Sequence, residues 1–208
     1  MKFYKTAKKP SEAQIVEKRS RFIGYIKPVK TEEEALEFLN SIRSKHWDAK
    51  HNVYAYALRN NSITRFSDDN EPSGTAGIPV LDVLKKNDIT DCIIVVTRYF
   101  GGILLGTGGL VRAYSAAAKA ALEDSGVVIM QLCSVYTLKC SYTSYGKISP
   151  LIQKYDGEID STEFAEDVVI KFHIPDEKIS FFNNALSELT NGSVFAEKIS
   201  EGFFAKKE

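Results

Sequence analysis

The most informative hydrophobic pattern in the chain lies between residues 91 and 122, where an apolar run is followed by glycines and then by an alanine-rich stretch. The run at 93–96 is short and β-branched, which predicts a buried strand. The later stretch has a helical period, with one apolar face made of Leu110, Ala113, Tyr114, Ala117 and Ala121. The pattern therefore predicts a strand, a glycine-rich loop and a core helix in succession.

Other patterns predict further elements before this stretch. We expect residues 1–10 to fray and residues 13–29 to hold one or two strands. Thr31 and Glu34 have the spacing of a capping box, which predicts a helix from there to about residue 45. Its expected inward side chains are Leu36, Leu39 and Ile42. Strands are predicted at 53–58 and 63–66, and a helix at 78–84 with Pro79 in its first turn.

The last third of the chain predicts a separate unit. A strand is expected at 126–134. The segments after it are a strand at 135–142, a helix at 144–155, strands at 157–164 and 167–174, a helix from 176 to 191 and a strand at 194–199. Their order is β-α-β-β-α-β, which is that of a ferredoxin-like fold. We therefore expect an α+β protein of two domains, residues 1–132 and 133–208.

Composition changes this picture in a few respects. The net charge is zero, but residues 1–30 carry nine Lys or Arg and two Glu, which permits contact with phosphates or protects a strand edge. No apolar run reaches the roughly 20 residues of a membrane span, and the N-terminus lacks a secretory pattern. The three cysteines form no CxxC pair, so we expect buried reduced thiols and a cytoplasmic protein. No metal site is predicted, because the Cys and His residues lack ligand spacing. No cofactor is predicted either.

The glycine-rich loop allows two interpretations. Its candidate anion-binding residues are Gly101, Gly102, Gly106, Thr107, Gly108 and Gly109. A strand, a glycine loop and a helix together can bring backbone N–H groups to an anion. The same arrangement also packs a helix tightly on a sheet, and composition favours this structural role. No lysine stands where a P-loop requires one, so a P-loop NTPase is not indicated.

A second unusual stretch, residues 67–77, is acidic and then small and polar. It contains Asp68, Asp69 and Glu71, followed by Ser73, Gly74 and Thr75. One interpretation is a polar turn that caps the next helix, which the spacing favours. The other is a site loop in which carboxylates act as a base or bind a cation and a glycine-flanked hydroxyl binds an anion.

Two motifs resemble those of a known family. The segments FSDDNEPSGTAGIP (66–79) and VVTRYFGGILLGTGGLVRAY (95–114) resemble the signature of the YigZ/IMPACT family, and the resemblance covers about residues 16–122. Residues 135–208 are similar to the C-terminal domain of its bacterial and archaeal members. The resemblance implies a ribosomal protein S5 domain 2-like first domain and a ferredoxin-like second domain similar to the last domain of elongation factor G.

The resemblance also suggests a role in translation. Eukaryotic members regulate the amino-acid starvation response by competing for a scaffold on the ribosome, and they carry an N-terminal RWD domain. The 208 residues of this chain leave no room for that domain, so we do not carry this partner over. The leading hypothesis is a translation-linked protein that binds RNA or a ribosome-associated factor rather than an enzyme.

Specific side chains support this hypothesis. Arg98 lies beside Tyr99 and Phe100, which predicts an exposed arginine–aromatic pair for a phosphate and a base. Arg112 and Lys119 are seven residues apart, on one helix face with Ser115. The binding residues that we expect, beyond the glycine loop and residues 73–75, are Lys50, His51, Arg98 and Arg112.

Two alternatives remain open from the sequence. In the first, Asp68, Asp69 and Glu71 face the glycine loop and act on a phosphorylated substrate, with His51 and Lys50 beside them for general base work. In the second, both motifs form one structural device in which acidic side chains pair with Arg98 or Arg112 and satisfy the loop backbone.

Overall fold

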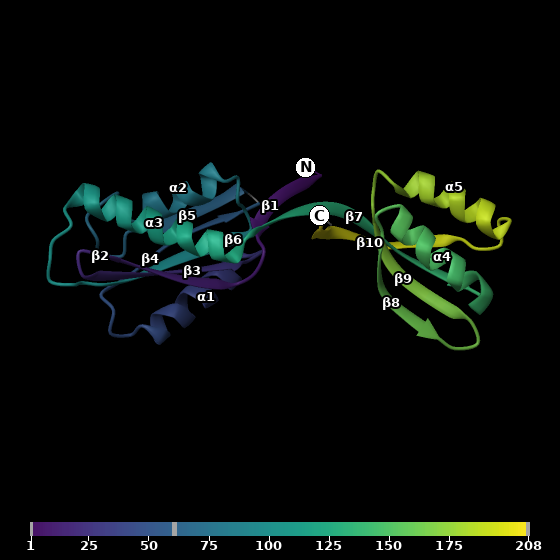
Figure 1. The fold of residues 1–208 in the computed structure, drawn as a ribbon, viewed down its shortest axis with the longest axis horizontal. Helices are drawn as coiled ribbons and strands as arrows, with labels where there is room; N and C mark the ends of the chain where they lie inside the picture. Colours follow the sequence, from purple (N-terminus) through teal and green to yellow (C-terminus); the bar gives the residue numbers. More distant parts are fainter. Residues whose placement is uncertain (1, 60–61, 207–208) are drawn as a thin grey trace. The chain divides into compact units, whose positions relative to one another are not determined.

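The computed structural model describes residues 2–59 and 62–206, which form two compact α+β units (Figure 1). One unit comprises residues 4–129, and the other combines residues 1–3 with 130–208. The division lies between Ile129 and Met130, within a strand, whereas the sequence placed the boundary after residue 132. The described residues contain no helix long and apolar enough to cross a membrane.

The N-terminal unit is a sheet between helices. Its five strands are β2 (Ser11–Glu17), β3 (Ser20–Pro28), β4 (His51–Leu58), β5 (Ile63–Ser67) and β6 (Cys92–Tyr99). Their order is β2-β3-β6-β4-β5, and every neighbouring pair is antiparallel. The helices are α1 (Glu32–Lys45), α2 (Gly77–Lys86) and α3 (Thr107–Ser125). Figure 1 shows α1 on one face of the sheet and α2 and α3 on the other.

The central strand β6 explains why this sheet is covered on both faces. Ile94 and Val96 join the apolar core beneath α2 and α3, whereas Ile93 and Val95 join the core beneath α1. Successive side chains of a strand point to opposite faces, so a continuous apolar run fits only a strand with both faces buried. The predicted buried strand is therefore confirmed.

Helix α1 begins with the predicted cap, with one difference in its partners. The Glu34 N–H donates to the Thr31 hydroxyl at 3.2 Å, but the Glu34 carboxylate accepts from the Lys30 N–H at 2.7 Å rather than from Thr31. The buried side chains are Ala35, Leu39 and Ile42. The expectation that Leu36 points inward was wrong, because the small Ala35 occupies the contact with the sheet and Leu36 is exposed.

The C-terminal unit has the predicted element order. Its elements are β7 (Val127–Cys140), α4 (Tyr142–Lys154), β8 (Glu158–Phe164), β9 (Val168–Pro175), α5 (Ile179–Thr190) and β10 (Ala196–Ala205). The strands are ordered β10-β7-β9-β8, with antiparallel neighbours. The two strands expected at 126–134 and 135–142 are one continuous strand, β7. Ile148, Phe172 and Phe182 are fully buried in this unit's core.

The expectation that residues 1–10 fray was wrong for residues 2–10, and residue 1 lies outside the described residues. Strand β1 (Phe3–Ala7) lies next to β7 in the sheet. The Lys8 N–H donates to the Gly126 carbonyl at 2.9 Å, and Tyr4 and Ala7 are buried. These partners lie more than a hundred residues away, so no local pattern indicated them.

Candidate functional site

One end of the N-terminal sheet gathers both sequence motifs. At this end β3 begins at Ser20 and β4 at His51, while β5 ends at Ser67 and β6 at Tyr99. The strand register pairs His51 with Arg98 directly. We call this the motif end of the sheet, because the acidic stretch follows β5 there and the glycine-rich loop follows β6.

A buried ionic cluster joins the two motifs. The Arg98 Nη1 donates to the Glu71 Oε1 at 2.6 Å, and the Tyr114 hydroxyl donates to the same oxygen at 2.7 Å. Arg98 is 7% exposed and Glu71 is 9% exposed. The His51 Nε2 lies 3.9 Å from the Glu71 carboxylate. We call Glu71, Arg98 and Tyr114 the buried cluster; it shows that the two remote segments meet in the fold.

Electrostatics bind this cluster together. Arg98 is a buried cation, and the carboxylate of Glu71 supplies its compensating charge. Among the described residues, the Arg98 Nε is a buried atom without a hydrogen-bond partner. Burial, followed by the neighbouring Glu71 carboxylate, raises the pKa of Tyr114 far above its usual range, so the phenol stays a donor. A buried charge that is paired in this way is costly to unpair.

The expected exposed arginine–aromatic pair was wrong in its arginine. Arg98 follows Val96 by two residues in β6, so it points to the buried α2/α3 face. Its guanidinium carbon lies 5.5 Å from the centre of the Phe22 ring and 5.6 Å from that of Phe100. Phe100 itself is exposed, whereas Tyr99 is half-buried.

The carboxylates of the acidic stretch are engaged within the protein. Asp68 accepts backbone N–H groups from Gly74 at 2.9 Å, Ala76 at 3.0 Å and Gly77 at 2.8 Å, which caps the chain entering α2. Asp69 accepts the Asn52 N–H at 2.6 Å and lies 3.5 Å from Arg43. The geometry supports the interpretation of this stretch as a polar turn before a helix.

The small polar residues after the carboxylates are partly engaged as well. The Gly74 N–H is bonded to Asp68, and the Thr75 hydroxyl donates to the Pro72 carbonyl at 2.7 Å. Ser73 is exposed. The His51 Nδ1 is bonded to the Asp69 carbonyl at 2.8 Å. These contacts place the residues expected to bind an anion around the acidic turn.

The glycine-rich loop packs against the turn between β2 and β3. The Gly101 N–H donates to the Ser20 hydroxyl at 3.1 Å. A Cβ on Gly101 would lie 2.1 Å from the Arg19 carbonyl carbon, so this close approach of two backbones requires glycine. Beyond it, Gly102, Gly106, Thr107 and Gly108 are exposed, and Gly109 packs on Leu105.

The β2–β3 turn is strained and basic. Glu17 pairs with Ser20, so the turn consists of Lys18 and Arg19 alone, with φ of 46° and 64°. Two-residue turns with positive φ at both positions favour Asn-Gly, because side chains with a Cβ are strained there. Backbone strain of this kind is often found at functional sites. Lys18 and Arg19 therefore occupy two positions for which the backbone conformation alone would favour Asn and Gly.

Exposed basic and apolar side chains surround this turn. Trp47 is 84% exposed and Leu104 is 82% exposed. We define the tip surface as the exposed basic and apolar side chains at the motif end, namely Lys18, Arg19, Arg21, Trp47, Lys50, Phe100, Ile103 and Leu104. The exposed carboxylates of Glu17 and Asp48 lie at the same end. The tip surface combines cations with exposed aromatic and aliphatic side chains, a composition typical of interaction sites.

Sequence reasoning missed a hydrogen-bonded chain on the other face of the sheet. The Tyr99 hydroxyl donates to Asp48 at 2.8 Å and accepts from the His46 Nδ1 at 2.9 Å, and the His46 Nε2 accepts from the Tyr25 hydroxyl at 2.6 Å. Burial, followed by Lys45, lowers the pKa of His46. Because successive side chains of a strand point to opposite faces, the sequence could have indicated that Tyr99 lies on the face opposite to Arg98. We call Tyr25, His46 and Tyr99 the neutral chain; it ends on the exposed carboxylate of Asp48.

Arg112 does not belong to the buried cluster. It is exposed and lines a groove between α2 and α3 together with Ser115 and Lys119, which confirms that these three residues share a helix face. The described residues hold no group of three or more His, Cys, Asp or Glu able to bind a metal ion. All three cysteines are free and buried, and burial raises the pKa of Cys92 to about 12.

Comparisons with known proteins cover both units. The family described as the Impact N-terminal domain matches residues 18–122, and a domain of unknown function (DUF1949) matches residues 138–193. The chain is 41% identical to "IMPACT family member YvyE" of Bacillus subtilis (strain 168) over 190 residues, which cover 91% of this chain and 88% of that protein.

Two further comparisons agree with these matches. "IMPACT family member YigZ" of Escherichia coli (strain K12) is 36% identical, covering 88% of this chain and 92% of its own. A solved structure described as "Crystal structure of an hypothetical protein" is 33% identical with a TM-score of 0.62, covering 96% of this chain and 98% of that one. This chain belongs to the IMPACT family.

Proposed function

We propose that this protein is a translation-linked binding protein whose tip surface engages RNA, free or within the ribosome. The observation that carries the proposal is the strained turn, in which Lys18 and Arg19 both have positive φ and both are exposed. The strain costs stability, and cations that reach phosphates from a protruding turn provide a functional reason for it.

The neighbouring side chains supply the other half of RNA recognition. Phe100 and Trp47 are exposed aromatic groups on which unstacked bases can stack, and Arg21 lies over the Tyr99 ring at 4.5 Å. Phosphate contacts provide affinity, while stacking selects single-stranded or looped RNA. The buried cluster holds β6 and the acidic turn beneath this surface and so keeps it in place.

The fold supports the same role by analogy. The strand order β10-β7-β9-β8 of the C-terminal unit supports a ferredoxin-like fold similar to the last domain of elongation factor G. We assign the N-terminal unit to the ribosomal protein S5 domain 2-like fold on the same family resemblance. Fold analogy alone does not establish function, so the tip surface carries the proposal.

The arrangement favours binding over phosphoryl chemistry. Asp68 caps three backbone N–H groups, Asp69 accepts the Asn52 N–H, and Glu71 pairs with Arg98. A general base needs a carboxylate within reach of a substrate proton. These three carboxylates instead serve the protein's own donors.

The test separates binding from stability. Replacing Lys18 with Asn and Arg19 with Gly removes two charges and installs the residue pair that this turn prefers. We expect the double variant to unfold at a higher temperature and yet to bind a structured RNA at least tenfold more weakly. The slope of log affinity against log salt should fall in magnitude by about 2, because about one counterion is released per phosphate contact.

The control carries the same loss of charge elsewhere. Lys30→Gln with Lys147→Gln changes two exposed lysines that lie outside the motif end, and it should leave RNA affinity within about twofold. Fluorescence anisotropy at several salt concentrations gives both numbers. Equal RNA binding by the turn variant and the wild type, or binding without salt dependence, would contradict the proposal.

A further inference from the structure

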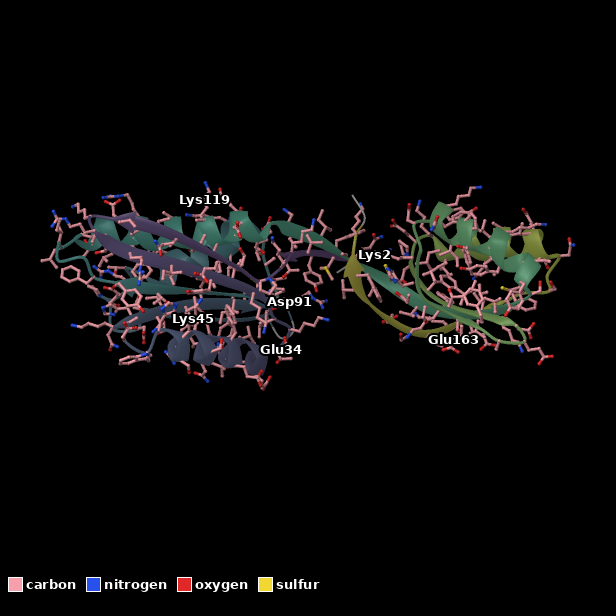
Figure 2. The ribbon with its side chains drawn as sticks, turned by 60° about the horizontal axis from the view of Figure 1, so that its bottom comes forward. Lys2, Glu34, Lys45, Asp91, Lys119 and Glu163 are labelled. Carbon is pink, nitrogen blue, oxygen red and sulfur yellow. The ribbon has the colours of Figure 1, made fainter. Side chains whose placement is uncertain are left out.

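The outer surface of α2 and α3 carries a groove that the proposed RNA contact does not use. The groove holds about 520 Å³ and is lined by Pro79, Asp82, Val83, Lys86, Asn87, Val111, Arg112, Ser115, Ala116 and Lys119. Figure 2 labels Lys119 on α3, on the opposite side of the sheet from Glu34 of α1. The groove therefore lies on the face covered by α2 and α3.

The floor of the groove is aliphatic. Pro79 and Val83 contribute from α2, and Val111 and Ala116 contribute from α3. Val111 is 37% exposed. The small side chains of Ser115 and Ala116 leave room for close approach by another element. The lining contains no aromatic residue, so it offers no platform for stacked bases.

The rim of the groove is mainly cationic. Lys86, Arg112 and Lys119 stand on it, against the single carboxylate of Asp82. Lys119 lies 3.4 Å from Glu123, one turn further along α3. No described residue forms an ion pair with Lys86 or Arg112. Two cations without an ion-pair partner lie beside an apolar floor. This surface is complementary to a binding partner that has an apolar stripe flanked by acidic side chains.

We propose that this groove docks an acidic amphipathic helix of another protein. The lining runs from Pro79 to Asn87 and from Val111 to Lys119, which at 1.5 Å per residue is about 12 Å of each helix. That length accommodates about two turns of a third helix, packed with its side-chain ridge between α2 and α3. Its apolar stripe covers Val83 and Val111, and its acidic side chains pair with Lys86 and Arg112.

The experiment titrates the full chain with labelled peptides. One peptide has leucines spaced i, i+3, i+4 and i+7 with glutamates on both sides, and the second is its scramble of identical composition. A third carries lysines in place of the glutamates, and an RNA oligonucleotide completes the set. We expect the acidic amphipathic peptide to bind at least tenfold more tightly than its scramble. The amide NMR shifts should concentrate in α2 and α3.

Two variants locate the interaction. Lys86→Glu with Arg112→Glu reverses the charge of the rim and should weaken the acidic peptide at least tenfold while improving the lysine peptide. Lys85→Glu is the matched control, because Lys85 is exposed beside Lys86 and does not line the groove; it should stay within about twofold.

Several outcomes would overturn the proposal. They are equal binding of the scramble, shifts outside α2 and α3, or an undiminished affinity after the rim reversal. RNA that binds the groove in preference to the peptide would assign this face to nucleic acid instead. A change in self-association after Lys86→Glu with Arg112→Glu, seen by analytical ultracentrifugation without peptide binding, would assign it to a second copy of the chain.

Discussion

Two neighbouring residues of β6, Arg98 and Tyr99, satisfy their polar groups in different ways on the two faces of the sheet. On the α2/α3 face, Arg98 enters the buried cluster, where one carboxylate balances one cation. On the α1 face, Tyr99 enters the neutral chain, in which His46 accepts from one phenol and donates to another. Both arrangements satisfy polar groups where an apolar sheet ends, but only the first contains a buried full charge.

The difference between them concerns the cost of losing a partner. Removing one member of a buried ion pair leaves the other charge desolvated, whereas removing one member of a neutral chain costs about the free energy of a hydrogen bond. The two faces should therefore respond very differently to equally small substitutions. The following three substitutions test this contrast, from the largest expected effect to the smallest.

Glu71→Gln should have the largest effect. The substitution keeps the shape and leaves an acceptor for Tyr114, but it leaves the Arg98 charge without a counter-ion, so the free energy of unfolding should fall by about 3–5 kcal/mol. Urea unfolding measures this, with the exposed Glu37→Gln as the control within about 0.5 kcal/mol. Adding Arg98→Met should restore part of the loss. A cost for Glu71→Gln no larger than that of the control would mean that Arg98 finds another partner.

Asp68→Asn should cost less, although it also lies on the α2/α3 face. Asparagine replaces one acceptor oxygen by a donor, so one of the three capped N–H groups loses its bond and the remaining two lose a charged acceptor. We expect the free energy of unfolding to fall by about 1–3 kcal/mol. Asp88→Asn, at an exposed position with positive φ that asparagine tolerates, is the matched control. An equal effect of the two substitutions would show that the cap contributes nothing to stability.

His46→Gln should have the smallest effect, and one that depends on pH. Burial lowers the pKa of His46 in the folded state below its ordinary value near 6.5. The unfolded chain therefore binds the proton first, so wild-type stability falls as pH falls through 6.5 toward the folded pKa. The glutamine side chain of the variant does not titrate. The loss of about 1 kcal/mol at pH 8 should thus shrink at pH 5, as measured by urea unfolding at both pH values. A loss that grows at low pH would contradict the neutral state of His46.

Much of the fold followed from periodicity. The run at 93–96 predicted a buried strand, and the segments after residue 134 predicted the β-α-β-β-α-β order, because these signals lie in neighbouring residues. Strand β1 was missed because its partner β7 is remote in sequence. Leu36 was misplaced because Ala35, Leu39 and Ile42, spaced i, i+4 and i+7, form the buried face of α1, and Leu36 lies beside that face.

The site was less accessible to sequence reasoning. The two motifs could be named, but which of their charges meet depends on the register of β4 with β6 and on the path of the acidic turn. Glu71 and Arg98 are 27 residues apart. One clue was available, since alternation from Val96 places Arg98 on a buried face, and a buried cation requires a counter-ion. The binding role of residues 73–75, the glycine loop and Lys50 stays a prediction.

The contact at Gly101 also has a consequence for engineering. There the backbone of the glycine-rich loop touches the backbone of the β2–β3 turn with no side chain between them. The position of the tip surface therefore depends on the absence of a side chain at Gly101 rather than on the groups that face solvent. Libraries randomised at Lys18, Arg19, Phe100 and Leu104 should therefore keep the scaffold while altering what it recognises. Any residue other than glycine at position 101 would push the loop from the hairpin and disrupt the whole surface at once.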